Sequence, residues 1–421
     1  MSEKIELYLN GTLCGGVTQK NGGSLEFKYD DGYSEDRTPL SLSMPIQVPV
    51  HPNKSIRAYL EGLLPDNENA LKGLGKRLSE SPNNPFALLK HIGRDVAGAL
   101  EIYPEGESPT DNNDDKELIK IDEMEIEARL RGKIAEYQDG VVVAKNYGKI
   151  SLPGAQPKIA LHKSITGEWF IPTNSHPSTH ILKPLTEKLK NQDIVEHLTL
   201  QAARNLGLNV CESEITSLRD LRVFIAKRYD RALNQDSGKY VRLHQEEFCQ
   251  ALSVTPSKKY QFEDRGPGVG EIARLISKLP IIENREAVAR AFFEGLVFNI
   301  FGRCPDAHAK NYSLILINHE VNLAPLYDLT TGAPYGYTDN SAMSINGKYD
   351  FSIISKRDLL VEARRLKIDE EWASERISFI CDNIVTSFEE ARDLALQVVP
   401  NRESVLSVIV DILDMLNKAV T

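Results

Sequence analysis

The sequence predicts an α+β fold in which a strand-rich part of the chain is followed by a helix-rich part. Short apolar runs with turn residues at their ends recur up to about residue 226, and several of them alternate apolar with polar residues. From about residue 245 onward, apolar residues mostly recur at helical spacing. Many unrelated proteins share this order of elements, so the layout alone does not decide the function.

The first hundred residues are predicted to form a small mixed subdomain. Apolar and polar residues alternate over residues 5–9 and again over 25–29. Asn10-Gly11 directly after the first run is a typical hairpin turn. Helical spacing follows over residues 55–92, with interruptions at prolines.

A polar linker is predicted to separate this subdomain from a second strand-rich unit, residues 111–230. The linker is the acidic stretch EGESPTDNNDDKE, residues 105–117. One helix is expected from Asp193 to Leu206, where Gly207 ends it. The strands expected here cover residues 141–144, 159–162, 169–171, 180–183 and 221–226.

The last part, residues 231–421, is predicted to be mostly helical. Its most apolar helix is expected over residues 287–301, and three further helices run to the C-terminus. One hairpin, formed by residues 312–317 and 321–325, interrupts the helices. The glycine-rich GPGVG at 266–270 follows no strand and is predicted to be a loop.

The composition is that of a globular protein and disfavours direct DNA binding. Of the 421 residues, 41% are hydrophobic and 26% are charged. The 50 basic and 60 acidic residues give a formal net charge of −10, whereas binding to phosphate backbones needs clustered cations. A basic partner is therefore expected to make most of any DNA contact.

The cellular location is predicted from features that the sequence lacks. The N-terminus MSEKIELYLNG has no apolar signal-peptide segment, and no apolar run reaches the roughly 18 residues of a membrane helix. The five cysteines are widely spaced and form no C-x-x-C pair, which is typical of reduced thiols. We expect a cytoplasmic protein that does not enter a membrane.

Asp306 and Asn311, five positions apart in CPDAHAKN, give the sharpest chemical signal. Phosphoryl transfer needs a carboxylate to orient and deprotonate the attacking hydroxyl, and an amide oxygen to hold Mg²⁺ against the phosphates. Protein kinases carry both groups on an Asp-x-x-x-x-Asn loop. His308 and Lys310 lie between them and could approach a phosphate. The alternative is a polar loop with an Asx turn at Asp306 and a strand start at Asn311.

Asp328 is a second candidate metal ligand. It follows the predicted hairpin that begins after Asn311, and a hairpin returns the chain to its starting edge. Two oxygen donors could then share one Mg²⁺, as they do in kinases. The alternative is an aspartate that caps the next turn.

Lys183 ends a predicted strand, and kinases use a strand lysine to bind the α- and β-phosphates and to pair with a helix glutamate. Glu196, in the first turn of the next predicted helix, is the candidate partner. The alternatives are a solvated lysine and a capping box formed by Asp193 and Glu196.

The turn SLPGAQPK, Ser151–Lys158, could cradle phosphates with its backbone amides. It matches neither the Walker A pattern nor G-x-G-x-x-G, so its chemistry alone is a weak signal. The chain also lacks H-E-x-x-H and G-x-S-x-G motifs, which leaves zinc protease and serine hydrolase functions without support.

Together these segments resemble the HipA family, the kinase toxins of bacterial toxin–antitoxin pairs. The order and spacing agree from about residue 4 to residue 350, and the residues beyond are matched only as helices. The strings that carry the resemblance are PLSLSMPI (39–46), GLLPDN (62–67), IGRDVAGAL (92–100), SLPGAQPKIAL, THILKP, VEHLTLQAARNLGL, RLHQEEFCQAL (242–252), GPGVGEI, DAHAKNYSL and APLYDL.

The resemblance implies a two-lobed, protein-kinase-like fold with ATP and Mg²⁺ as cofactors. Its parts would be an extra N-terminal subdomain (1–110), a strand-rich N-lobe (111–230) and a mostly helical C-lobe (231–421). Asp306 would be the catalytic base, Asn311 and Asp328 the Mg²⁺ ligands, and Lys183 the contact to the ATP phosphates.

The resemblance also implies where the nucleotide is held. The loop over the phosphates would be Pro153, Gly154, Ala155, Gln156, Pro157 and Lys158. The adenine-contacting hinge would be Lys227, Arg228 and Tyr229, mainly through backbone atoms. The chain departs from the family at Lys227, where an acidic residue is common, and at Pro157, where the loop is often acidic. A side-chain contact from Lys227 to the ribose is therefore in doubt.

Ser151 is implied to be an autophosphorylation site that inactivates the kinase. A phosphate dianion beside the ATP phosphates would repel them and displace the short loop. The alternative is an ordinary hydroxyl at the end of a strand.

The resemblance implies protein partners as well. Such toxins are held by a HipB-type helix-turn-helix antitoxin, which binds operator DNA and lets the toxin act as a co-repressor. One family member phosphorylates glutamyl-tRNA synthetase, but the target of this chain stays open. The alternatives are a catalytically weak co-repressor scaffold and a small-molecule kinase.

Overall fold

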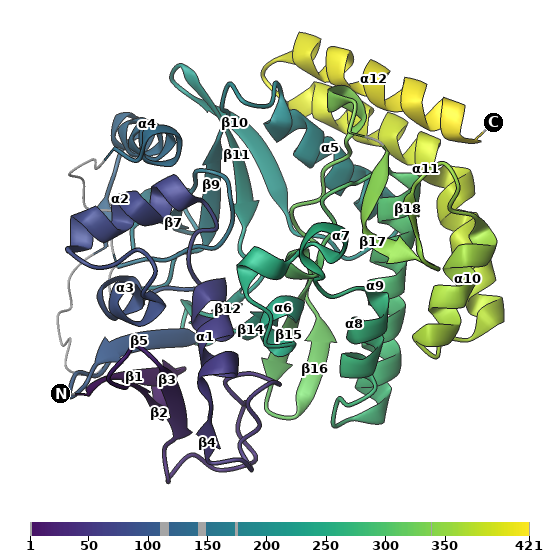
Figure 1. The fold of residues 1–421 in the computed structure, drawn as a ribbon. Helices are drawn as coiled ribbons and strands as arrows, with labels where there is room; N and C mark the ends of the chain where they lie inside the picture. Colours follow the sequence, from purple (N-terminus) through teal and green to yellow (C-terminus); the bar gives the residue numbers. More distant parts are fainter. Residues whose placement is uncertain (1, 110–117, 142–148, 173–175, 338, 421) are drawn as a thin grey trace.

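The computed structural model describes residues 2–420 except for 110–117, 142–148, 173–175 and 338. Figure 1 shows a purple N-terminal subdomain at one end of the molecule and a yellow helical layer at the other. Strands dominate the first part and helices the second, which confirms the predicted α+β class. Most of the predicted linker and of the predicted strand 141–144 lie outside the described residues.

The N-terminal subdomain is an antiparallel sheet with two helices packed on it and a third helix packed against one of these. The strand order is β4-β3-β2-β1-β5. The Asn10-Gly11 turn joins the first two strands with both residues at positive φ, as the sequence predicted. The elements are β1 Glu3–Leu9, β2 Thr12–Gln19, β3 Leu25–Tyr29, β4 Val50–His51, α1 Asn53–Gly62, α2 Glu68–Leu78, α3 Pro85–Ile92 and β5 Leu100–Pro104.

The second unit is a six-stranded antiparallel sheet in the order β10-β11-β9-β7-β8-β6. Helices α4 and α5 contact this sheet, and apolar side chains from both the helices and the strands form its core. The elements are β6 Ile119–Lys120, α4 Glu123–Asp139, β7 Ile159–Lys163, β8 Trp169–Ile171, β9 His180–Pro184, α5 Gln192–Asn205, β10 Ser213–Leu218 and β11 Leu221–Lys227.

The third part is built around the long buried helix α9, Ile282–Phe301, against which α11 packs. A three-stranded sheet, β14-β15-β16, carries the loops of the site described below. The remaining elements are β12 Arg231–Asn234, β13 Lys239–Arg242, β14 His244–Glu247, α6 Phe248–Ala251, α7 Gln261–Asp264, α8 Val269–Ile276, β15 Ser313–Ile317, β16 Glu320–Leu323, β17 Asn340–Ile345, β18 Lys348–Asp350, α10 Lys356–Arg365, α11 Glu370–Val398 and α12 Arg402–Val420.

Two sequence-based expectations for this part were wrong. A second hairpin, β17–β18, follows the predicted one. GPGVG is only partly a loop, because Gly268 caps α8 and the next two residues lie in the helix. Strand β14 escaped prediction because its sequence, HQEE, is wholly polar although every residue of it is buried. Hydropathy cannot detect a strand whose polar side chains are satisfied inside the protein.

Candidate active site

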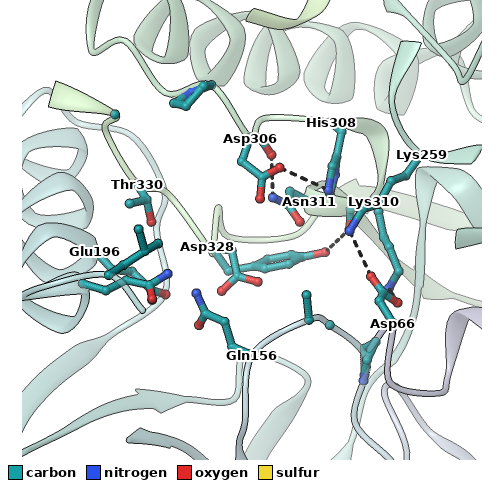
Figure 2. A pocket seen from close by; sticks show the side chains of 18 of the residues that line it. Asp66, Gln156, Glu196, Lys259, Asp306, His308, Lys310, Asn311, Asp328 and Thr330 are labelled. Carbon is teal, nitrogen blue, oxygen red and sulfur yellow. Dashed lines mark hydrogen bonds and ion pairs between the residues drawn. The ribbon is translucent and has the colours of Figure 1, made fainter. Parts of the chain in front are cut away.

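The loop that follows α9 presents Asp306 and Asn311 together. The Asn311 side-chain amide donates a hydrogen bond to the Asp306 carbonyl oxygen at 2.8 Å, which leaves its own amide oxygen available as a metal ligand. The Asp306 carboxylate accepts a 2.6 Å hydrogen bond from the Tyr260 hydroxyl, and its side chain is 58% exposed at the mouth of a cavity. Figure 2 shows both side chains above the open space.

Asp328 reaches the same cavity from the other side. The β15–β16 hairpin is formed as the sequence predicted, and the chain then runs alongside Asn209 and Cys211 to Asp328. Asp328 has φ 52°, a left-handed backbone conformation that turns the chain sharply at this point. The main cavity, about 460 Å³ in volume, is lined by Asp306, Asn311 and Asp328 together.

Lys183 lies between two carboxylates. Its ammonium group is 2.8 Å from Glu196 Oε1 and also contacts Asp328 Oδ1. Burial opposes its charge, but these two carboxylates outweigh burial and raise the Lys183 pKa above its ordinary value. Burial raises the pKa of Glu196 to about 7, and Lys183 only partly offsets this because the nearby Asp328 adds repulsion.

The structure does not support the capping-box alternative for Glu196. The N-cap of α5 is Asn191, and no side chain caps this end of the helix. Asp193 instead forms an ion pair with Arg222. The lysine–glutamate contact therefore exists as predicted, whereas its role in nucleotide binding stays a prediction.

The Ser151–Lys158 turn covers the cavity. Four of its residues, Pro153–Gln156, and Lys158 line the cavity, whereas Pro157 does not. In Figure 2 Gln156 points up towards Asp328. Gly154 has φ 110°, a conformation that L side chains rarely adopt. Lys158 donates a hydrogen bond to the Pro153 carbonyl oxygen at 2.9 Å, and burial lowers its pKa to about 8.

An inner cavity of about 110 Å³ adjoins the main one and contains the predicted hinge. Its apolar wall includes Leu152, Ile181, Ala226, Tyr229 and Tyr327, which suits a flat aromatic ring. The rings of Tyr229 and Tyr327 are stacked with centroids 5.6 Å apart. The Tyr229 hydroxyl donates to Gln245 at 2.9 Å.

The side chains of Lys227 and Arg228 are engaged elsewhere. Lys227 is exposed and lies 3.0 Å from Glu212. Arg228 is buried and donates to both oxygens of Asp230, at 3.0 and 2.8 Å, and to the Val96 carbonyl oxygen. Any contact from these two residues to an adenine must therefore come from backbone atoms.

His308 and Lys310 both line the cavity, but neither offers an unpaired positive charge to a phosphate. Burial lowers the pKa of His308 to about 4, so its ring is neutral at pH 7. The Lys310 ammonium is 2.8 Å from Glu247 and 3.6 Å from Asp66. A direct phosphate contact by His308 would thus be a contact by an uncharged imidazole.

Ser151 does not line the main cavity. Its hydroxyl is buried and donates a 2.6 Å hydrogen bond to the Leu63 carbonyl oxygen. Directly before it, Ile150 forms an isolated parallel β-bridge with Asp95, and the next described strand, β7, begins at Ile159. Any enzyme that phosphorylates Ser151 therefore has to reach it in a displaced loop.

Several residues of the cavity wall were missed in the sequence, and three of them carry charged or hydroxyl groups that contact the catalytic loop or each other. These three are Asp66, Lys259 and Tyr260, and the first of them belongs to the N-terminal subdomain. Asp66 stands in the GLLPDN string, which was a usable signal. Lys259-Tyr260 follows a polar loop whose composition marks no particular chemistry.

The donor set fits Mg²⁺ of the kind that is held together with phosphates. Among the described residues, no group of three or more His, Cys, Asp or Glu side chains could bind a metal alone. An Asn oxygen and an Asp carboxylate leave most coordination positions to phosphate and water, as Mg²⁺ prefers. Asn311 and Asp328 would be these two ligands.

Family models match most of the chain. The HipA N-terminal domain matches residues 5–103, and the HipA-like C-terminal domain matches residues 150–388. The chain belongs to the HipA family. This match confirms the resemblance drawn from the sequence strings. Curated relatives of the chain are named as kinases, so we describe it as a HipA-type kinase.

Proteins related to this HipA-type chain include a candidate kinase, Y4mE of Sinorhizobium fredii. It is 32% identical over 79% of this chain and 78% of the relative. The serine/threonine-protein kinase toxin HipA of Shewanella oneidensis is 28% identical, with 82% and 79% covered. HipA in a solved complex with HipB and operator DNA from Shewanella oneidensis superposes with a TM-score of 0.81 at 24% identity, covering 98% of this chain and 97% of that one. This superposition confirms the two-lobed fold with its added N-terminal subdomain.

No helix among the described residues is both long and apolar enough to cross a lipid bilayer.

Proposed function

We propose that this HipA-type chain is an ATP- and Mg²⁺-dependent serine/threonine-protein kinase. The observation that carries the proposal is one cavity lined by Asp306, Asn311 and Asp328, with the Lys183–Glu196 ion pair beside the last of these. This is the set of groups that phosphoryl transfer needs. The loop after α9 supplies Asp306 and Asn311, whereas Asp328, Lys183 and Glu196 come from three other segments of the chain.

Each residue has a proposed task. Lys183, held in place by Glu196, binds the α- and β-phosphates, and the backbone of Lys227–Tyr229 pairs with the adenine ring. Asp306 orients the attacking hydroxyl and accepts its proton as the new O–P bond forms and the bond from the γ-phosphorus to ADP breaks, so that ADP leaves. Asn311 and Asp328 would hold Mg²⁺, which would supply positive charge to neutralise the ATP phosphates. The Pro153–Lys158 loop keeps water away from the transferred group.

The proposed regulation and partners follow the HipA family. Ser151 would be autophosphorylated and would then inactivate the enzyme, since its hydroxyl can leave Leu63 only when the loop moves. A HipB-type antitoxin would carry the acidic chain to operator DNA, because the net charge is −10. The substrate would be a protein hydroxyl, with glutamyl-tRNA synthetase as the first candidate to test.

Intact-mass spectrometry before and after incubation with Mg-ATP tests this function. Wild-type protein that starts unmodified is expected to gain one phosphate on Ser151. The Ser151→Ala variant is expected to gain none at that position and to stay active. Asp306→Asn serves as the control without a catalytic base. No phosphate on any form, with ATP binding intact, would instead support the co-repressor scaffold.

The side chain of Lys227 is expected to be dispensable for ATP binding. It pairs with Glu212 at the surface, and exposed ion pairs contribute at most about 1 kcal/mol. The Lys227→Ala variant should therefore bind ATP within about fivefold of wild type by calorimetry, since about 1 kcal/mol corresponds to that factor. A larger loss would show that the side chain contacts the ribose, as an acidic residue would in other family members.

A further inference from the structure

We propose that Asp66, a residue of the N-terminal subdomain, is a positioning residue for phosphoryl transfer that ties the phosphate loop to the catalytic loop. The inference rests on the proposed kinase function. It adds to the proposed active site a residue that lies outside the two lobes. A series of contacts connects the phosphate loop to the catalytic base, and it runs through Gly154, Asp66, Lys259, Tyr260 and Asp306.

The first contact joins Asp66 to the phosphate loop through the backbone. Asp66 lies between α1 and α2, and its amide donates to the Gly154 carbonyl oxygen at 3.1 Å. Pro65 forms a parallel β-bridge with the same glycine. Two residues earlier, the Leu63 carbonyl oxygen accepts the Ser151 hydroxyl. The N-terminal subdomain thus holds the covering loop near its middle and at its start.

The second contact joins Asp66 to the C-lobe through its carboxylate. Lys259 lies 3.1 Å from Oδ2 and Lys310 lies 3.6 Å from Oδ1, and only 9% of the aspartate side chain is exposed. Figure 2 shows the three side chains converging at one corner of the cavity. Burial alone would raise the Asp66 pKa, but the nearby lysines lower it, so the carboxylate is ionised at neutral pH.

The last contact passes from Lys259 to its neighbour Tyr260. The Tyr260 hydroxyl donates to Asp306 Oδ1 at 2.6 Å, and its ring packs edge-on against His308 at a centroid distance of 4.9 Å. This hydrogen bond fixes the orientation of an otherwise exposed carboxylate. A catalytic group displaced by about 1 Å can lose about 10²-fold in rate, so anchoring the Lys259–Tyr260 segment matters for the chemistry.

The experiment compares four single variants in a Ser151→Ala background. The rate of γ-phosphate release from saturating Mg-ATP and the ATP dissociation constant are measured for each. Asp66→Asn and Lys259→Met are expected to lower the rate about 10–100-fold, with the ATP dissociation constant within about threefold of the background. Lys259→Arg keeps the ion pair and should keep the rate within about threefold. Glu68→Gln, an exposed acid at the start of α2, is the matched control and should change neither quantity.

Hydrogen exchange over residues 256–266 gives a readout that needs no activity. This segment is held by backbone bonds such as Lys258 to Thr255 and Gly266 to Tyr260. Exchange should be faster in Asp66→Asn and Lys259→Met than in Glu68→Gln. If the Ser151→Ala background releases no phosphate, the proposed kinase function is wrong. In that case the hydrogen-exchange rates alone test whether Asp66 anchors the Lys259–Tyr260 segment.

Three results would overturn the inference. One is unchanged exchange in Asp66→Asn. Another is unchanged phosphate release despite faster exchange, in a background that is active. The third is a loss of ATP affinity as large as the loss of rate, which would make Asp66 a nucleotide contact instead.

Discussion

Replacing Asp306 with asparagine is expected to slow phosphoryl transfer by about 10²–10⁴-fold, the usual contribution of a positioned acid–base group. Asparagine has almost the same size, and its amide oxygen can still accept the hydrogen bond from Tyr260. It cannot take the proton of the attacking hydroxyl. ATP binding should survive, because the nucleotide is proposed to be held by Lys183, the hinge backbone and the phosphate loop.

The measurement is the phosphorylation rate at saturating Mg-ATP, together with the ATP dissociation constant. Asp264→Asn is a matched control, because this aspartate lies on α7 outside the main cavity. An Asp306→Asn enzyme within tenfold of wild type would remove Asp306 from the role of base. Equal losses in both variants would point to a general effect of lost negative charge.

Replacing Asp95 with alanine is expected to lower the free energy of unfolding by about 3–5 kcal/mol, as breaking a buried ion pair does. Asp95 is 3% exposed and accepts hydrogen bonds from Arg231 at 2.8 Å and from the Ser178 amide at 3.0 Å. Arg228 and Arg242 lie 3.8 and 3.7 Å away. Without the carboxylate, three largely buried guanidinium groups would share too little negative charge.

Urea unfolding of wild type and Asp95→Ala at pH 7 measures the loss. Asp236→Ala, at the exposed turn between β12 and β13, is the control and should stay within about 0.5 kcal/mol. Burial would raise the Asp95 pKa, but the arginines hold it well below its ordinary value of about 3.9. Its contribution is therefore fully present above that ordinary value and is lost as the pH falls towards the folded-state pKa, so the difference between the proteins should shrink in acid. An equal difference at both ends of the pH range would contradict the ion-pair explanation.

The local patterns of the sequence predicted much of the fold. Alternation predicted β1 and β3, Asn10-Gly11 predicted the turn between β1 and β2, and Gly207 marked the end of α5. The pairing of Lys183 with Glu196 was predicted from the kinase pattern of a strand lysine and a helix glutamate, and the ion pair is present.

Polar contacts between residues far apart in the chain could not be predicted from local sequence patterns. The Asp66–Lys259 ion pair joins residues that are 193 positions apart, and although Asp66 stands in the GLLPDN string, nothing around Lys259 marks it as the partner. Arg228 was assigned to the adenine site by position, yet its guanidinium is used by Asp230 and by a carbonyl oxygen of Val96. A sequence shows which side chains carry charge, but the partner of each charge is decided only when the segments pack.

The charge cluster around Asp95 limits how the cleft could open to release a bound nucleotide. The cluster joins the N-terminal subdomain to the residues after the hinge, and the Gly98 amide donates a hydrogen bond to the Asp230 carboxylate at 2.7 Å. The adenine end of the cleft cannot widen without separating these buried ions. The phosphate end is covered by a loop held through a few backbone bonds at Gly154 and Ser151. Spent nucleotide would therefore depart phosphate end first, and the time that ADP resides on the enzyme would be governed by how often residues 151–158 lift.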